Sequence, residues 1–149
     1  MGFAFRPMRG NWRTVEYTSM STSTFAKGAL VAFGGTNLLV EGATGSPSMI
    51  GIVTQNSADS LPAGKYQVAV PGDRSAVCTG PIPTNTAASA LSAGLCYGIN
   101  KSGNTQYIDC ASQASAFFQL TGTYDSTTSR AEAYLLLNVL SMPSESSSL

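Results

Sequence analysis

The sequence predicts an all-β protein, and three observations support that prediction. Charged residues make up only 11% of the 149-residue chain, against about a quarter in an average soluble protein. Serine, threonine, glycine and asparagine take their place, which suits strands and tight turns better than solvated helices, because such helices favour ionic i,i+4 pairs. From Lys27 onward, short apolar runs are separated by turn residues. A chain of this length can form one small domain without a metal or a disulfide.

The apolar runs between residues 27 and 140 are read as short strands. The last run is ambiguous, because its apolar residues also share one face of a helix. The segment 85–93 is alanine-rich, is followed by Gly94 and is the best helix candidate. The expected strands are 28–33, 36–41, 48–54, 66–70, 75–79, 95–99, 106–111, 115–120 and 131–140, and 122–129 is expected to be a loop.

Two pairs of these strands are expected to form hairpins. Pro71-Gly72 fits a type II turn between 66–70 and 75–79, and this is the clearest hairpin in the sequence. A second turn over 101–104 joins 95–99 to 106–111. That pairing would place Cys96 and Cys110 nearly opposite each other, so that a disulfide between them is an open possibility beside the simpler interpretation of buried free thiols.

The two halves of the chain have a similar order of segments. Lys27–Val31 leads to 37–40, then to 49–53 and 65–70, and 93–97 leads to 105–108, 116–120 and 131–137 with similar spacings. The pattern predicts two similar β-units that form one small barrel or sandwich. It also favours a strand over a helix for 131–137.

Residues 1–26 are expected to form an extended N-terminal arm, and residues 141–149 a flexible serine-rich tail. Aromatic residues stand among arginines in the arm without a strand or helix period, so they need a surface to pack against. The favoured interpretation is a clamp that binds a partner, and the alternative is a terminal strand folded onto its own domain. The candidate partner-binding residues are Phe3, Phe5, Arg6, Arg9, Trp12 and Arg13.

The residues that carry most enzyme chemistry are absent or scattered. The chain has no histidine and three cysteines, none in a Cys-x-x-Cys pair, so we expect neither a catalytic triad nor a zinc site. The eight acidic residues are isolated along the sequence, which argues against a glycosidase carboxylate pair. We therefore expect a non-catalytic protein without a metal or a cofactor.

Charge and hydropathy bear on the expected partners. The formal net charge is zero, so no overall field attracts the chain to nucleic acid or to an anionic membrane. No apolar run approaches the roughly 20 residues of a membrane span. The N-terminus does not resemble a signal peptide, and synthesis in a cytoplasm is expected.

Three motifs resemble the capsid decoration, or cement, proteins of tailed phages. They are Lys27-Gly28-Ala29-Leu30-Val31, then Ile50-Gly51-Ile52-Val53, then the run from Ala63 to Val70. The second half, with 93–97 and 131–137, resembles the rest of the pattern, whereas Phe117-Phe118 and the arm depart from it. The resemblance implies a small β-barrel or tulip-like fold, homotrimers on the outer capsid surface of a virion, and the major capsid protein as partner.

A glycan-binding or adhesin-like β module of a phage head or tail fibre is the alternative. Such modules present an exposed tryptophan or tyrosine flanked by amides and carboxylates. Trp12 is the only tryptophan and lies in the arm, but Tyr97, Tyr107 and Tyr124 are candidates for such a platform.

Overall fold

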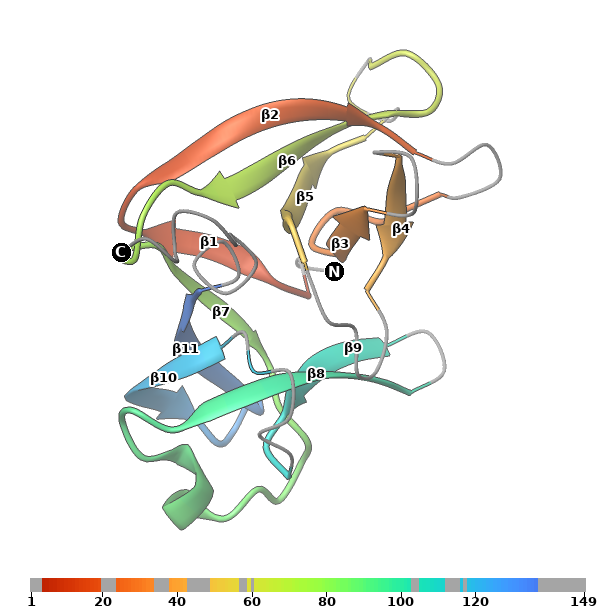
Figure 1. Cartoon of the computed structure of the whole chain (residues 1–149). Helices are drawn as coiled ribbons and strands as arrows, with labels where there is room; N and C mark the ends of the chain where they lie inside the picture. The colour runs from red at the N-terminus through yellow and green to blue at the C-terminus, as the bar shows by residue number, and fades with distance from the viewer. Residues whose placement is uncertain are drawn as a thin grey trace.

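The strands form two antiparallel sheets, which confirms the predicted all-β class. Figure 1 shows the five-stranded sheet above the six-stranded sheet, with β1 at the level between them. This computed structural model describes residues 4–19, 24–33, 38–42, 49–56, 59, 61–102, 105–111, 116 and 118–136.

The five-stranded sheet is curled. Its order is β2-β6-β5-β3-β4, and a parallel bridge between Ser19 and Leu39 brings the end of one edge strand to the other. The sheet therefore approaches a closed barrel at that end. Its strands are β2 (Trp12–Thr18), β3 (Leu30–Phe33), β4 (Leu39–Glu41), β5 (Gly51–Gln55) and β6 (Lys65–Pro71).

The six-stranded sheet has the order β1-β7-β11-β10-β8-β9. The hairpin predicted around residues 101–104 is present, with Ser102 opposite Thr105. The last predicted segment, 131–140, is a strand as far as Leu135, and its residues 137–140 lie outside the described residues. The strands are β1 (Arg6–Arg9), β7 (Val77–Pro81), β8 (Cys96–Ser102), β9 (Thr105–Asp109), β10 (Phe118–Asp125) and β11 (Arg130–Leu135).

The predicted pair of similar β-units is present and is larger than the sequence suggested. The first unit is β2 to β6 and the second is β7 to β11. Each unit places its first strand beside its fifth, followed by the fourth, the second and the third, and β1 is added at the outer edge of β7. The fold is thus a repeated five-strand unit with one additional N-terminal strand.

Hydrogen bonds also repeat between the two units. The N–H of Gly28 donates to the carbonyl of Val53 at 2.7 Å, and the N–H of Gly94 donates to the carbonyl of Leu120 at 2.8 Å. Strand registers agree as well, since the pairs Leu30–Ile52 and Ile52–Ala69 in the first unit correspond to Cys96–Gln119 and Gln119–Tyr134 in the second.

The turn before the last strand of each unit has the same left-handed backbone. Gly64 has φ +80° and Ser129 has φ +53°. Their carbonyls accept hydrogen bonds from the N–H groups of Ser19 at 2.8 Å and Ile82 at 2.9 Å, respectively. The second unit therefore holds a serine in a conformation that glycine adopts without strain.

Exchanging the residues at these two turns is expected to change stability in opposite directions. Ser129→Gly should raise the free energy of unfolding by up to about 1 kcal/mol, and Gly64→Ser should lower it by about the same amount. A Cβ at Gly64 would meet only the Ser19 hydroxyl, at 3.9 Å, so steric overlap does not obscure the comparison. Urea unfolding measures the free energy of unfolding of both variants. A change of the same sign in both would contradict the equivalence of the two turns.

Two buried clusters share the strands of the first unit. Leu30 and Ile52 lie in the cluster between the two sheets, and their neighbours Val31 and Val53 lie in the cluster inside the curled sheet. Strands β3 and β5 are therefore buried on both faces, which explains why their sequences are continuous apolar runs rather than alternating ones.

The hairpin predicted at Pro71-Gly72 is wrong. Strand β6 pairs with β2 and β5, whereas β7 pairs with β1 and β11 in the other sheet. Two segments cross between the sheets, one between β1 and β2 and one between β6 and β7. They are hydrogen-bonded to each other, because the N–H of Gly72 donates to the carbonyl of Asn11 at 2.7 Å. Residues 6–18 and 65–79 thus form one long antiparallel ladder that bends at this corner.

The helix predicted for 85–93 is also wrong. Only a four-residue 3-10 turn, η2 (Ala88–Leu91), is present, and the residues on both sides of it, Ala87 and Ser92, are extended. Asn85 has a left-handed φ of +64°, which ends any helix that would begin there. Part of the predicted loop 122–129 belongs to β10, which continues to Asp125.

The three cysteines are free thiols. Continuing the β8–β9 register from Gly98 opposite Asp109 places Cys110 opposite Tyr97, one position from Cys96. Adjacent positions of a strand face opposite sides of a sheet, so the possible Cys96–Cys110 disulfide does not form.

Candidate functional site

The described part of the N-terminal segment differs from the predicted arm. Residues Arg6–Arg9 form β1 and Trp12–Thr18 form β2, each paired along its length with a strand of the domain. The alternative interpretation, a terminal segment folded onto its own domain, describes these residues. The β domain therefore begins before residue 27, and its described strands run from Arg6 to Leu135. The predicted tail, 141–149, lies outside the described residues.

The predicted partner-binding residues have separate environments. Phe5 is 0% exposed and stacks on Phe118, so it is not available to a partner. Trp12 is half-buried, and its indole N–H donates to the carbonyl of Arg9 at 2.9 Å. Arg6 and Arg13 are exposed, and a contact between them and a partner stays a prediction. Phe3 lies outside the described residues.

A network of polar side chains covers the outer face of the six-stranded sheet. Arg9 donates two hydrogen bonds to Glu132, at 2.8 and 2.9 Å, across the intervening strand β7. The Thr121 hydroxyl donates to the same carboxylate at 3.1 Å. Bidentate pairing of this kind fixes both side chains, so β1, β10 and β11 are held together on this face.

A second contact extends the network along β11. The guanidinium of Arg130 donates to the Thr79 hydroxyl at 3.0 Å. Burial and the nearby charge of Arg6 both lower the pKa of Arg130. Arginine nevertheless stays charged at neutral pH, so this part of the face carries two neighbouring cations.

The Glu132 carboxylate is expected to make stability depend on pH. Its hydrogen bond to Arg9 holds its pKa below the ordinary value of 4.5. A carboxyl group with a lowered folded-state pKa contributes stability above its unfolded pKa, and the contribution is lost as pH falls through the folded value. Glu132→Gln should therefore destabilise the protein at neutral pH and leave stability unchanged well below pH 4.5.

Thermal unfolding across this pH range measures the effect. Glu16→Gln is the matched control, because Glu16 is exposed on β2 and makes no ion pair within the described residues. If the unfolding temperatures of wild type and Glu132→Gln differed by the same amount at every pH, the role of the Glu132 charge would be contradicted.

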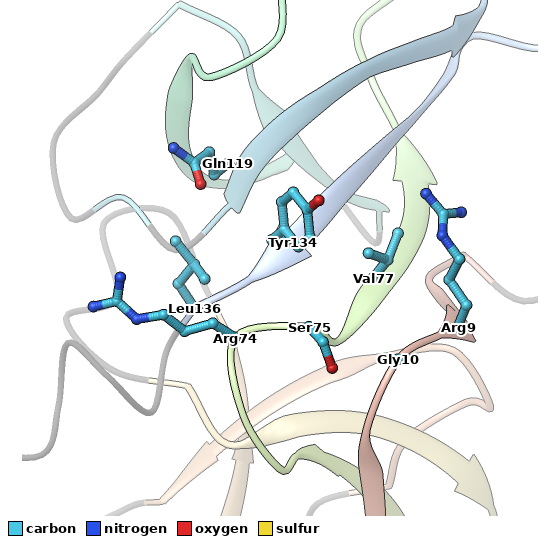
Figure 2. A pocket seen from close by; sticks show the side chains of 8 residues that line it. All are labelled: Arg9, Gly10, Arg74, Ser75, Val77, Gln119, Tyr134 and Leu136. Atoms are coloured by element: carbon cyan, nitrogen blue, oxygen red, sulfur yellow. The ribbon is translucent and has the colours of Figure 1, made fainter.

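A large hollow of about 570 Å³ lies beside this network, at the corner where the chain crosses between the sheets. Figure 2 shows Arg9 and Arg74 on opposite sides of the hollow, with Tyr134 between them. Gln119 lies directly opposite Tyr134 in the strand register. The residues that line the hollow are Arg9, Gly10, Arg74, Ser75, Val77, Gln119, Tyr134 and Leu136.

Three of the lining side chains have free polar groups. Arg74 is exposed, Gln119 and Tyr134 are half-buried, and none of the three donates or accepts a side-chain hydrogen bond within the described part of the chain. Arg9 differs, because Glu132 compensates its charge. The hollow thus combines one uncompensated cation, an amide and a phenol.

The backbone beside Arg74 is fixed by its neighbours. Asp73 accepts hydrogen bonds from the N–H and hydroxyl of Ser75, at 2.8 and 2.6 Å, and from the amide of Asn11 at 3.2 Å. These bonds lower the pKa of Asp73, those from Ser75 most strongly. Within the described residues, Asp73 makes these bonds and no ion pair with the Arg74 guanidinium.

A smaller hollow of about 230 Å³ lies near the other end of β11 and includes Glu132 and Arg130. Tyr124, one of the tyrosines considered as a glycan platform, is 41% exposed and lines it. Tyr97, by contrast, is buried and donates its hydroxyl to the carbonyl of Ala90 at 2.7 Å. The Arg9–Glu132 pair therefore stands between two hollows, since each partner lines one of them.

Three further observations concern other chemistry. Among the described residues, no group of three cysteine or acidic side chains lies close enough to hold a metal ion. The part of the chain that the structure describes has no helix of the length and apolarity that a membrane span requires. Burial raises the pKa of the Cys78 thiol to about 12, which leaves that group protonated and unreactive.

Comparisons of the chain with protein-family models, with curated proteins and with solved structures found no match.

Proposed function

We propose that this chain is a non-catalytic structural subunit that binds the outer surface of an icosahedral phage capsid and stabilises the shell. The observation that carries the proposal is the placement of the three motifs that resemble decoration proteins. They fall on β3, β5 and β6, which are neighbours in one sheet. Two of them have, as their second residue, a glycine with left-handed backbone, Gly28 or Gly64, a conformation that glycine adopts without strain.

The physical character of the domain suits a shell subunit. Residues 6–9 and 12–18 are already paired with the two sheets, so these residues need no separate folding step on binding. The low charge content of 11% limits repulsion between closely spaced copies. A protein that binds only the assembled lattice stabilises that lattice by mass action. The proposed partners are the major capsid protein and, as a trimer, further copies of this chain.

Co-sedimentation with isolated heads that lack the protein tests this function. We expect saturable binding of the full chain in multiples of three copies at each lattice three-fold position. Removal of the N-terminal segment is not a suitable variant, because Phe5 belongs to the core; point variants of exposed residues are used instead. Absence of binding at any protein concentration would overturn the proposal.

A glycan-binding module is the second candidate, and the larger hollow favours it. Tyr134 has the Gln119 amide directly opposite and interacts electrostatically with Arg9, which gives the ring and the amide expected of such modules, with a cation in the place of the carboxylate. Binding to an array of neutral and acidic oligosaccharides, lost in Tyr134→Ala, would support this candidate. An array without signal, together with head binding, would reject it.

A further inference from the structure

We propose that the larger hollow receives a carboxylate side chain from an acidic peptide segment of the partner, with Arg74 as the anchoring residue. This inference rests on the proposed capsid partner, and it moves the expected contact from the predicted arm to the corner between the sheets. It names a residue that the sequence did not single out.

The charges around the hollow define the ligand class. Arg9 is compensated by Glu132 at 2.8 Å, and the carboxylate of Asp73 is engaged by Ser75 and Asn11. Arg74 has no ion pair within the described residues. A guanidinium without a counter-ion binds a carboxylate in a bidentate manner, so an anionic ligand group is favoured over a cationic one.

The rest of the lining favours a peptide side chain over a small free anion. Leu136 supplies apolar surface beside Arg74, Tyr134 and Val77 supply more toward Arg9, and Gln119 supplies an amide that can donate and accept. A glutamate side chain has both the methylene groups and the carboxylate that such a lining accommodates. The volume of about 570 Å³ is large enough for a side chain with its flanking backbone.

The hollow is also held in shape before a ligand arrives. Asn11 and Ser75 are joined by a backbone-to-hydroxyl hydrogen bond of 3.0 Å, and Gly72 bonds the Asn11 carbonyl. On the opposite side the Arg9–Glu132 pair fixes β1 against β11. A site that needs little ordering on binding retains more of its contact energy as affinity.

The first test compares matched arginine variants of the full chain in the head-binding assay. Arg74→Gln should weaken apparent affinity by about tenfold or more, the loss expected for one charge-assisted hydrogen-bonded contact. Lys65→Gln removes one positive charge from β6, in the other sheet and outside the hollow, and should change affinity much less. Arg74→Lys keeps the charge without the bidentate geometry and should give an intermediate loss. Equal effects of Arg74→Gln and Lys65→Gln would overturn the inference and leave capsid binding intact.

A second test does not depend on heads. NMR titration of the full chain with acetyl-glycyl-glutamyl-glycine amide should give saturable shifts of the side-chain signals of Gln119 and Tyr134, and the glutaminyl analogue should not. Loss of these shifts in Arg74→Gln supports the carboxylate site even if heads are not bound, a result that would overturn only the capsid partner. Glucuronate binding more tightly than the glutamyl peptide would overturn the peptide class, and no response to either would overturn the site.

Discussion

Phe5→Ala is expected to lower the free energy of unfolding by about 3–5 kcal/mol, the range measured for removal of a fully buried phenylalanine. The side chain is 0% exposed and stacks on Phe118 with ring centroids 5.5 Å apart. The Phe5 ring lies against Gly80 of β7, where a Cβ atom would overlap the ring. The glycine therefore leaves the space that the ring occupies. The backbone N–H of Phe5 also donates to the carbonyl of Gly28 at 3.0 Å.

Met8→Ala is the control for this experiment. Met8 belongs to the same N-terminal segment but is 49% exposed, so its truncation should change stability by no more than about 0.5 kcal/mol. Urea denaturation of both variants gives the comparison. Equal stability of the two variants would mean that the segment is not part of the core and would restore the arm interpretation.

Gln106→Leu is expected to lower the free energy of unfolding by about 2–4 kcal/mol, because it leaves buried backbone groups without their hydrogen-bond partner. Gln106 is 4% exposed. Its amide accepts from the N–H of Leu30 and donates to the carbonyls of Leu30 and Gly42, each at 2.9 Å. This side chain of β9 thereby joins the six-stranded sheet to β3 of the other sheet.

Gln55→Leu makes the same chemical change at an exposed position on β5 and should be nearly neutral. Amide hydrogen exchange adds a local measurement, since the Leu30 N–H should lose protection in Gln106→Leu before the amides of β7 do. Unchanged stability in Gln106→Leu would show that water or a shifted backbone satisfies these groups.

The sequence alone predicts those strands that are marked by residues close together in the chain. The apolar runs of β3 and β5 and the turn before β9 each depend on residues close together in the chain, and the similarity of the two halves follows from comparing the order of such local segments. The same local reasoning failed at Pro71-Gly72, because a turn motif gives the bend but not the sheet to which each strand goes. It failed again at 85–93, where alanine content indicates helix propensity but Asn85 adopts a left-handed backbone.

The candidate site could not be predicted from the sequence, because long-range pairing assembles it. Arg9 and Glu132 are 123 positions apart, and Arg74, Gln119 and Tyr134 come from a corner and two strands with no shared motif. The sequence alone predicts an arm for Phe5, because the residues that bury its ring, Gly80 and Phe118, lie far along the chain. The N-terminal segment is basic, as its sequence indicates, but Arg9 forms an ion pair with Glu132 of the same domain.

Thermal disruption of heads, followed by release of packaged DNA with and without the protein, is the most direct test of the shell-stabilising function. Heads lacking the protein should open at a higher temperature as the full chain is added, and the increase should saturate together with binding. Arg74→Gln should require a higher protein concentration for the same increase. Saturable binding without any change in the temperature of DNA release would contradict the stabilising role, and no binding would contradict the proposed function altogether.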